Sequence, residues 1–508
     1  MQQGKNRLEA RLDHPNGFFG RDSVVDDIIY RLNGTSPYDS PQNIITVQGE
    51  PGLGKTEVCK DVLKKLMVID AKLIYVDVRG KVGLMGLVQQ IALEINCNIP
   101  DHLIPKEVTK LVLTELRKEE RVILYIDNFE DLFHGKPLEH EDSREVIYWL
   151  TSCVHTNLQA LVSTSRFPSN VGHKVDLEEL KAPFDKQLFF EIWGRQDPNT
   201  KIDEVALTDL IDAIGGHPLA LVLVAAQAGR YPLRELLNNW PRWAKVEYAD
   251  NERHQSLLTA VQLSWESIKD NSLVQKIWGL LSLCPQDLRF DVICEALQNE
   301  GDPIAIREAM GLLIASNLAS YKGENEVTML SPIKEMCFEY NQDLEELCAS
   351  LLGEYYYQLT DKAIERRTSN CLQVHYIVLD ILPDIFWFQE RCVIKKLHKE
   401  MLLRLTRNLG NYYQFNSYLA ITTIKLLLIH FGEMQDCIVP FLRLQLGDLQ
   451  GRLGQIDAAL ESYAQAEELY RSEKDNLGLA NVLKGRGDLQ RRLGQIDAAL
   501  ESYAQAEE

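Results

Sequence analysis

The sequence predicts a multidomain fold of mixed class, with an α/β domain on a parallel sheet in the N-terminal part and all-α domains after it. Short apolar runs alternate with helix-like segments between residues 43 and 163. From residue 345 to about 440 the chain is apolar at helical spacing and poor in Pro and Gly. A long segment near the C-terminus recurs almost unchanged. At about 100–200 residues per domain, the 508 residues suffice for several domains.

The α/β prediction rests on four apolar runs that read as buried parallel strands. They cover residues 43–48, 73–78, 121–126 and 158–163. Helix-like segments separate them, over residues 58–68, 84–95 and 107–118. This alternation is typical of a doubly wound sheet, in which nucleotide sites lie beyond the carboxyl ends of the strands.

The first run leads into a segment that fits the pattern GxxxxGK(S/T) and precedes a helix-like segment. Such a loop turns its backbone N–H groups toward the phosphates of a nucleoside triphosphate at a helix N-terminus. Lys55 would reach the β- and γ-phosphates, and Thr56 would offer its hydroxyl to Mg²⁺. The predicted nucleotide-binding residues here are Gly49, Pro51, Gly52, Leu53, Gly54, Lys55, Thr56 and Glu57. The alternative is a Gly-rich turn with an exposed lysine.

Acidic residues follow the third run at the same predicted edge of the sheet. Asp127 directly follows this run in a pattern that resembles a Walker B motif, so it would hold Mg²⁺ directly or through water. Glu130 or Asn128 would orient the attacking water. For Asp127 and Glu130 the alternative is a solvated carboxylate at a strand end, because spacing does not give the direction of a side chain.

Arg166 follows the fourth run, where a guanidinium could sense the γ-phosphate. A hydrogen bond to a charged group contributes about 1.5–3 kcal/mol, whereas about 5.5 kcal/mol moves a two-state equilibrium from 1:99 to 99:1. One such arginine would therefore shift the equilibrium between two states but would not be enough to convert one state fully into the other. The alternative is a surface arginine that caps a helix or pairs with Glu178 or Glu179.

Two further motifs flank this set. They are Gly17-Phe18-Phe19-Gly20-Arg21-Asp22 before the loop and Gly215-Gly216-His217-Pro218-Leu219-Ala220-Leu221 after it. In this order, and together with the P-loop, Asp127 and Arg166, they resemble the NB-ARC domain of the STAND-class signalling ATPases. The resemblance spans roughly residues 18–340.

The resemblance implies an ATP/ADP site with Mg²⁺ in an AAA+/NB-ARC-like P-loop NTPase. It divides the chain into an N-terminal extension (1–17), a nucleotide-binding P-loop domain (18–182), a helical subdomain (183–248) and a winged-helix subdomain (249–342). By the resemblance, Phe19 and Arg21 line the adenine pocket and Pro218 packs on the adenine or ribose side. Ordinary turn and core residues are the alternative. His217 receives no catalytic role and could be a solvent-exposed loop residue.

The winged-helix expectation rests on a mainly helical pattern over residues 257–340 with a hairpin-like piece at 317–329. In relatives this subdomain closes over the ADP form, and plant members use a Met-His-Asp triplet there. The best matching stretch here is Met329-Leu330-Ser331, so the sequence leaves the autoinhibitory contact unassigned. A DNA-binding winged helix is the rival, but the segment has no basic helix of the kind that groove recognition requires.

A helical arm is expected over residues 343–440 and tetratricopeptide (TPR) repeats over 441–508. The segment 447–468 recurs at 487–508 with Gly451 replaced by Arg491, and position 487 lies 40 residues after position 447. Ala459, Tyr463 and Ala466 match the repeat pattern, although the period exceeds the usual 34 residues, which predicts extended helices. We expect the array to continue beyond residue 508 and its concave face to bind a protein or peptide trigger. A passive spacer is the alternative.

Composition limits the partners and the address. A net charge of −20 and a pI near 5.1 argue against a broad nucleic-acid or anionic-membrane surface, so nucleic acid is an unlikely partner. No run approaches 18 apolar residues and the N-terminus has no apolar signal region. The ten cysteines are scattered without a CxxC pair, as expected of reduced thiols in the cytoplasm. No membrane contact is predicted.

The leading interpretation is an ATP-dependent molecular switch that is a slow ATPase. It would be ADP-bound and closed at rest, exchange to ATP when the repeats bind their trigger, and self-associate through the NTPase module to activate an effector in defence or cell death. Two alternatives remain open. One is a transcription regulator on the same ATPase module, whose DNA-binding or effector domain is absent here. The other is a P-loop enzyme that phosphorylates a small molecule, for which no acceptor site is evident.

Overall fold

The computed structural model describes most of the chain. The described residues are 12, 17–33, 43–67, 71–81, 83–99, 105–133, 138, 140–154, 157–165, 167, 171–194, 203–243, 252–284, 287–322, 325–340, 342–364, 371–397, 399–432 and 438–507. They form two compact units, of which the first contains residues 1–98 and 110–344 and the second contains residues 99–109 and 345–508.

The first unit contains a five-stranded parallel sheet in the order β2-β3-β4-β1-β5. The strands are β1 (Ile44–Gln48), β2 (Lys72–Asp77), β3 (Val122–Asp127), β4 (Leu158–Thr164) and β5 (His173–Asp176). The first four confirm the four predicted runs. Every residue of β3 and β4 is buried, as expected of central strands that are covered on both faces. The fifth strand was not predicted.

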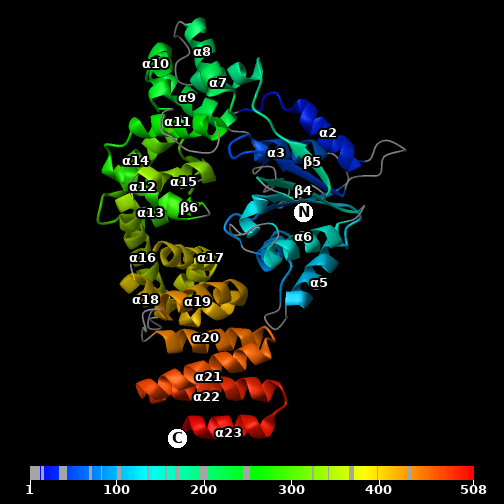
Figure 1. The fold of residues 1–508 in the computed structure, drawn as a ribbon, viewed down its shortest axis with the longest axis vertical. Coiled ribbons are helices and arrows are strands. Elements are labelled where there is room, and N and C mark those ends of the chain that lie inside the picture. The colour runs from blue at the N-terminus through cyan, green and yellow to red at the C-terminus, as the bar shows by residue number, and fades with distance from the viewer. Residues whose placement is uncertain are drawn as a thin grey trace. The chain divides into compact units, whose positions relative to one another are not determined.

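Helices cover both faces of this sheet. They are α2 (Asp22–Asn33), α3 (Lys55–Leu66), α4 (Gly83–Glu94), α5 (Pro105–Leu116) and α6 (Glu141–Cys153). Figure 1 shows α2 and α3 on one side of the sheet and α6 on the other. Val58 and Val62 of α3 pack in one core with Ile45 and Val47 of β1. This packing fixes the point where β1 turns into α3, which is the predicted P-loop.

A helical subdomain and a winged-helix subdomain complete the first unit. The former contains α7 (Phe184–Gly194), α8 (Glu204–Ile214), α9 (Pro218–Ala228) and α10 (Leu233–Trp243). Helix α11 (Glu252–Glu266) lies within the range predicted for the winged-helix subdomain, but it packs mainly on α9. The winged-helix subdomain contains α12 (Ser272–Leu283), α13 (Phe290–Ala296), α14 (Pro303–Ala315), α15 (Ser331–Tyr340) and the strands β6 (Leu288–Arg289), β7 (Ser320–Lys322) and β8 (Glu326–Thr328). The three strands form an antiparallel sheet in the order β6-β8-β7, which confirms the predicted hairpin. The domain boundaries given above stay predictions.

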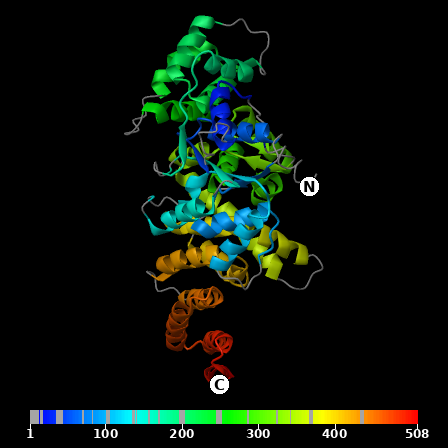
Figure 2. The same cartoon turned by 90° about the vertical axis from the view of Figure 1, so that its right-hand side faces the viewer.

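The second unit is helical. The arm comprises α16 (Gln342–Ile364), α17 (Cys371–Lys395), α18 (Lys399–Asn408) and α19 (Ser417–Gly432), and the repeats comprise α20 (Val439–Arg452), α21 (Ile456–Glu473), α22 (Asn476–Arg492) and α23 (Ile496–Glu507). The repeats form helix hairpins that follow one another in chain order (orange to red in Figure 1 and Figure 2). Helices α21 and α22 have 18 and 17 residues, in agreement with the predicted extended helices. Over the part of the chain that the structure describes, no helix combines the length and the apolar character needed to cross a membrane.

Candidate nucleotide site

The predicted P-loop lies at the turn from β1 to α3. Gly52 and Gly54 have φ angles of +84° and +89°, which glycine adopts without the cost that a Cβ imposes. The ammonium of Lys55, the first residue of α3, donates to the carbonyl oxygens of Gly49 (2.8 Å) and Glu50 (3.0 Å). Burial lowers the pKa of Lys55, while nearby carboxylates favour its charged form. The lysine is therefore held over the loop.

Asp127 lies at the carboxyl end of β3 and is 3% exposed. The Thr56 hydroxyl donates to its Oδ1 (2.9 Å), as does the Ser163 hydroxyl of β4, and the Tyr75 hydroxyl of β2 donates to its Oδ2 (3.0 Å). These residues meet because β2, β3 and β4 are neighbouring parallel strands. Burial and the charge of Asp77 raise the pKa of Asp127, and the hydrogen bonds oppose this rise.

These side chains fit a magnesium site. The Thr56 hydroxyl and the Asp127 carboxylate lie 2.9 Å apart, and hydroxyl and carboxylate oxygens are the ligands that this hard cation prefers. Glu130 follows in the short helix η1 (Phe129–Phe133). Its buried Oε2 finds no hydrogen-bond partner among the described residues, and its charge favours the protonated form of Lys55. Glu130 is thus close to the site with an unused acceptor.

The Gly-Gly-His-Pro segment contacts the P-loop. His217 caps α9, and its ring nitrogen Nε2 lies 3.1 Å from the carbonyl oxygen of Pro51. The Leu219 N–H donates to the carbonyl oxygen of Gly52 (3.3 Å). His217 is 3% exposed, so the expectation of a solvent-exposed loop histidine is wrong. Pro218 is the first residue of α9 and lies in the chain between His217 and Leu219, which both contact the loop.

The N-terminal motif also reaches the loop through Arg21. Its guanidinium donates to the carbonyl oxygens of Leu53 (3.5 Å) and Glu178. Burial lowers the pKa of Arg21 against the opposing charges of the neighbouring glutamates. Phe19 is half-buried, and its ring lies against Gly17.

Two other predicted residues are Glu57 and Arg166. Glu57 accepts from Lys60 (2.9 Å), one turn further along α3. Arg166 lies outside the described residues. Neither role predicted from the sequence is tested by the structure.

The prediction missed four residues around the site: Tyr75, Asp77, Ser163 and His217. Tyr75 and Asp77 belong to the second apolar run, and Ser163 ends the fourth, so their position at strand ends was the available signal. The contact between His217 and the loop had no such signal, because the two segments are 166 residues apart.

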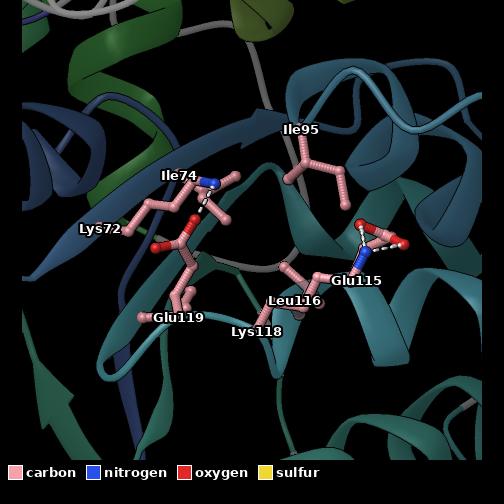
Figure 3. Close-up of a pocket in the computed structure, with 8 residues that line it drawn as sticks. Lys72, Ile74, Ile95, Glu115, Leu116, Lys118 and Glu119 are labelled. Carbon is pink, nitrogen blue, oxygen red and sulfur yellow. Dashed lines mark hydrogen bonds and ion pairs between the residues drawn. The ribbon is translucent and has the colours of Figure 1, made fainter. Parts of the chain in front are cut away.

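A small pocket of about 80 Å³ lies elsewhere on the same sheet. Its lining includes Lys72 and Val122, which begin β2 and β3. Figure 3 shows Lys72 paired with Glu119 at its border, at a distance of 2.6 Å. The pocket thus lies at the amino ends of the strands, whereas the P-loop lies at the carboxyl ends.

A parallel sheet with a GxxxxGK(S/T) loop after β1, and an aspartate that contacts the loop threonine from a nearby strand, define a P-loop NTPase. The family model of the AAA domain matches residues 38–167 and that of the tetratricopeptide repeat matches residues 441–508. The chain therefore contains an AAA-type P-loop NTPase domain and C-terminal TPR repeats. No curated protein matches the sequence.

Several solved structures resemble the chain at low identity. A STAND protein with a tetratricopeptide repeat sensor from Pyrococcus horikoshii is 14% identical over 96% of this chain and 76% of that chain, with a TM-score of 0.44. A Walker-type ATPase of Pyrococcus abyssi is 12% identical over 65% of this chain and 99% of that chain, with a TM-score of 0.34. The ORC1 protein of Aeropyrum pernix, solved in complex with DNA, is 16% identical over 66% of this chain and 95% of that chain, with a TM-score of 0.35. These values carry no argument about function.

Proposed function

We propose that this protein is an ATP/ADP-dependent signalling switch of the STAND class, with an NTPase module of the NB-ARC type and a TPR sensor. At rest it holds ADP in a closed state. A protein or peptide trigger on the repeats promotes exchange to ATP. The NTPase modules then self-associate and activate an effector in defence or cell death, and slow hydrolysis resets the switch.

The observation that carries this proposal is the contact between the P-loop and the Gly-Gly-His-Pro segment. His217 and Leu219 reach the carbonyl oxygens of Pro51 and Gly52, which belong to the loop that would surround the phosphates. Binding that changes the shape of this loop also changes its fit to α9. A ligand with different contacts in two arrangements shifts the population between them. The geometry therefore favours a nucleotide-dependent rearrangement of subdomains.

Four side chains would act at the phosphate end of the nucleotide, and three others on its base and ribose side. The loop N–H groups and the Lys55 ammonium would bind the β- and γ-phosphates. Thr56 and Asp127 would hold Mg²⁺, which supplies charge neutralisation on the phosphate oxygens. Glu130, with its free buried oxygen, would orient the attacking water. Phe19, Arg21 and Pro218 would line the base and ribose side.

The acidic composition argues against a broad nucleic-acid or anionic-membrane surface and so favours protein partners. TPR arrays bind proteins and peptides along their concave faces, so the trigger is sought among these. The prediction that nucleic acid is not a partner rests on the net charge of −20 and stays a prediction. The cytoplasmic address also stays a prediction.

The test is to identify the nucleotide that the purified full chain carries and to measure turnover. Stoichiometric ADP, with turnover well below about 1 per second, is the expected result. Lys55→Ala should abolish nucleotide binding. Lys64→Ala, an exposed lysine of the same helix, is the matched control and should bind like the wild type. Full binding by Lys55→Ala, or rapid turnover stimulated by a small acceptor, would refute the proposal.

A further inference from the structure

A chain of opposite charges joins the end of β2 to the winged-helix subdomain. The Arg79 guanidinium donates to Asp77 through Nε (2.9 Å) and Nη2 (2.7 Å). The same guanidinium reaches Asp287, which immediately precedes β6, at 3.3 Å and 3.4 Å. Lys322 of β7 donates to Asp287 from the other side (2.7 Å). Asp287 therefore lies between one cation of the nucleotide domain and one of the winged helix.

In the nucleotide domain, this series of ion pairs lies beside Asp127 and the acidic residues that follow β3. Asp77 lies directly opposite Asp127 in the register of β2 and β3. The Asn128 amide donates to Asp77 (3.1 Å), and Asn128 has a φ of +59°, which fixes the backbone just after Asp127. The Gly80 N–H donates to Asp131 (3.0 Å). The turn that contains Arg79 is thus hydrogen-bonded to Asn128 and Asp131, the two ends of the acidic segment 128–131.

Burial strengthens these ion pairs. The side chains of Arg79 and Asp287 are 17% and 7% exposed, so water screens them less than it screens a surface pair. Burial would raise the pKa of Asp287, but Arg79 and Lys322 outweigh it and hold the pKa at about 2. The pair is therefore charged at neutral pH. Among the described residues, removal of Asp287 leaves Arg79 paired with Asp77 alone, and removal of Arg79 leaves Asp287 paired with Lys322 alone.

We propose that Arg79 is a positioning residue of the nucleotide site and that its ion pair with Asp287 is the latch by which the winged helix stabilises the resting ADP state. The inference rests on the proposed function and names the regulation of the same site. When the winged helix is closed, Asp287 holds Arg79 against Asp77, and the acidic segment keeps one arrangement. When the winged helix moves away from the nucleotide domain, Arg79 loses its ion pair with Asp287. Arg79 and Asp77 are then less restrained, and the affinity of the site for ADP falls.

The test compares ADP release from the full chain with Asp287→Asn and Asp291→Asn. Asp287→Asn keeps the shape and removes the charge. Asp291→Asn is the matched control, because Asp291 pairs with Arg289 (3.0 Å) within the winged helix and contributes no contact to Arg79. Release of a fluorescent ADP should be about 10-fold faster for Asp287→Asn, within the 5–150-fold range of typical couplings, and unchanged for Asp291→Asn. The ratio of ADP to ATP affinity should fall by a similar factor. Loss of packing alone would not change this ratio. Arg79→Lys, which keeps the charge without the planar fork, should lie between the wild type and Arg79→Met.

Hydrogen exchange of residues 78–81 measures the contact itself without nucleotide. Faster exchange in Asp287→Asn together with faster ADP release supports the latch. Faster exchange with an unchanged affinity ratio would overturn it, because the pair would then serve stability only. Unchanged exchange would also overturn it. If the wild type bound no ADP, the proposed function would fail together with the latch, whereas normal ADP retention by all variants would refute the latch alone.

Discussion

The substitution Gly52→Ala tests how closely the P-loop and α9 fit. Gly52 has a φ of +84°, and a Cβ at this position would lie 2.7 Å from Cε1 of His217 and 3.0 Å from Cβ of Leu219. Gly54 provides a matched control in the same loop. It has a φ of +89°, and a Cβ added there would meet nothing within 4 Å among the described residues. The two alanine variants therefore share a backbone cost and differ in the steric contact.

The shared cost is about 1–2 kcal/mol, because a left-handed backbone brings Cβ near the following carbonyl oxygen. The steric contact adds about 1–3 kcal/mol, the usual cost of overpacking. His217 and Leu219 are 3% and 7% exposed, so neither can move freely into solvent. We expect Gly52→Ala to be destabilised by about 2–5 kcal/mol and Gly54→Ala by about 1–2 kcal/mol.

Denaturation without nucleotide is the assay, because phosphate contacts would otherwise enter the comparison. Two-state analysis does not hold for a multidomain chain, so the transition to follow is the one that added ADP shifts in the wild type. The double variant Gly52→Ala/His217→Ala should be less unstable than the sum of its single variants, because it removes the nearest clash. Equal midpoints for Gly52→Ala and Gly54→Ala would refute the close fit.

Three further predictions concern other parts of the chain. Asp127→Ala should keep nucleotide binding but lose Mg²⁺-dependent hydrolysis, as measured by fluorescent-nucleotide titration and phosphate release; hydrolysis at the wild-type rate would contradict its assigned role. Tyr463→Phe should cost about 1 kcal/mol, because the Tyr463 hydroxyl donates to Asp448 (2.7 Å). The equivalent Tyr503→Phe in the less buried second copy should cost less in the same denaturation assay. Burial raises the pKa of Glu390 from 4.5 to about 7. As the pH rises, Glu390 therefore ionises in the unfolded chain before it does so in the folded chain, and the free energy of unfolding falls between about pH 4.5 and 7. Glu390→Gln should therefore exceed the wild type in stability at pH 8 by up to about 3 kcal/mol and lose this advantage near pH 4.5. A stability difference between Glu390→Gln and the wild type that stays constant across this pH range would exclude the effect.

The strands that the sequence could predict are those whose burial leaves a continuous apolar run. The runs 43–48 and 121–126 became β1 and β3 with shifts of one residue at most at each end. His173–Asp176 forms β5 although it is polar, because it pairs with β1 alone at the edge of the sheet and alternates between half-buried and exposed residues. β6 has two residues, too few for any period to be read. Its conformation depends on pairing with β8.

In the candidate site, too, the residues of local motifs were predictable and those that depend on long-range contacts were not. The proximity of Lys55, Thr56 and Asp127 was predictable because these residues belong to a local motif and to the end of an apolar run. Ser163 and His217 were not, because their roles come from contacts across the sheet or between subdomains. A serine at a strand end and a histidine before a proline have many other uses. The sequence therefore predicts the residues that would touch the nucleotide better than those that position them.

The winged helix shows why a missing motif does not mean a missing contact. Met329-Leu330-Ser331 is the stretch of the sequence that best matches the triplet, but Met329 is 1% exposed and its sulfur lies 3.9 Å from the Ser282 hydroxyl within the winged-helix core. Met329 is therefore a core residue of the subdomain. Asp287, which immediately precedes β6, reaches the nucleotide domain through Arg79 instead. In the proposed latch, Asp287 would act on the nucleotide site through Arg79. Closure of the winged helix would then be coupled to the nucleotide through the charges of these two side chains.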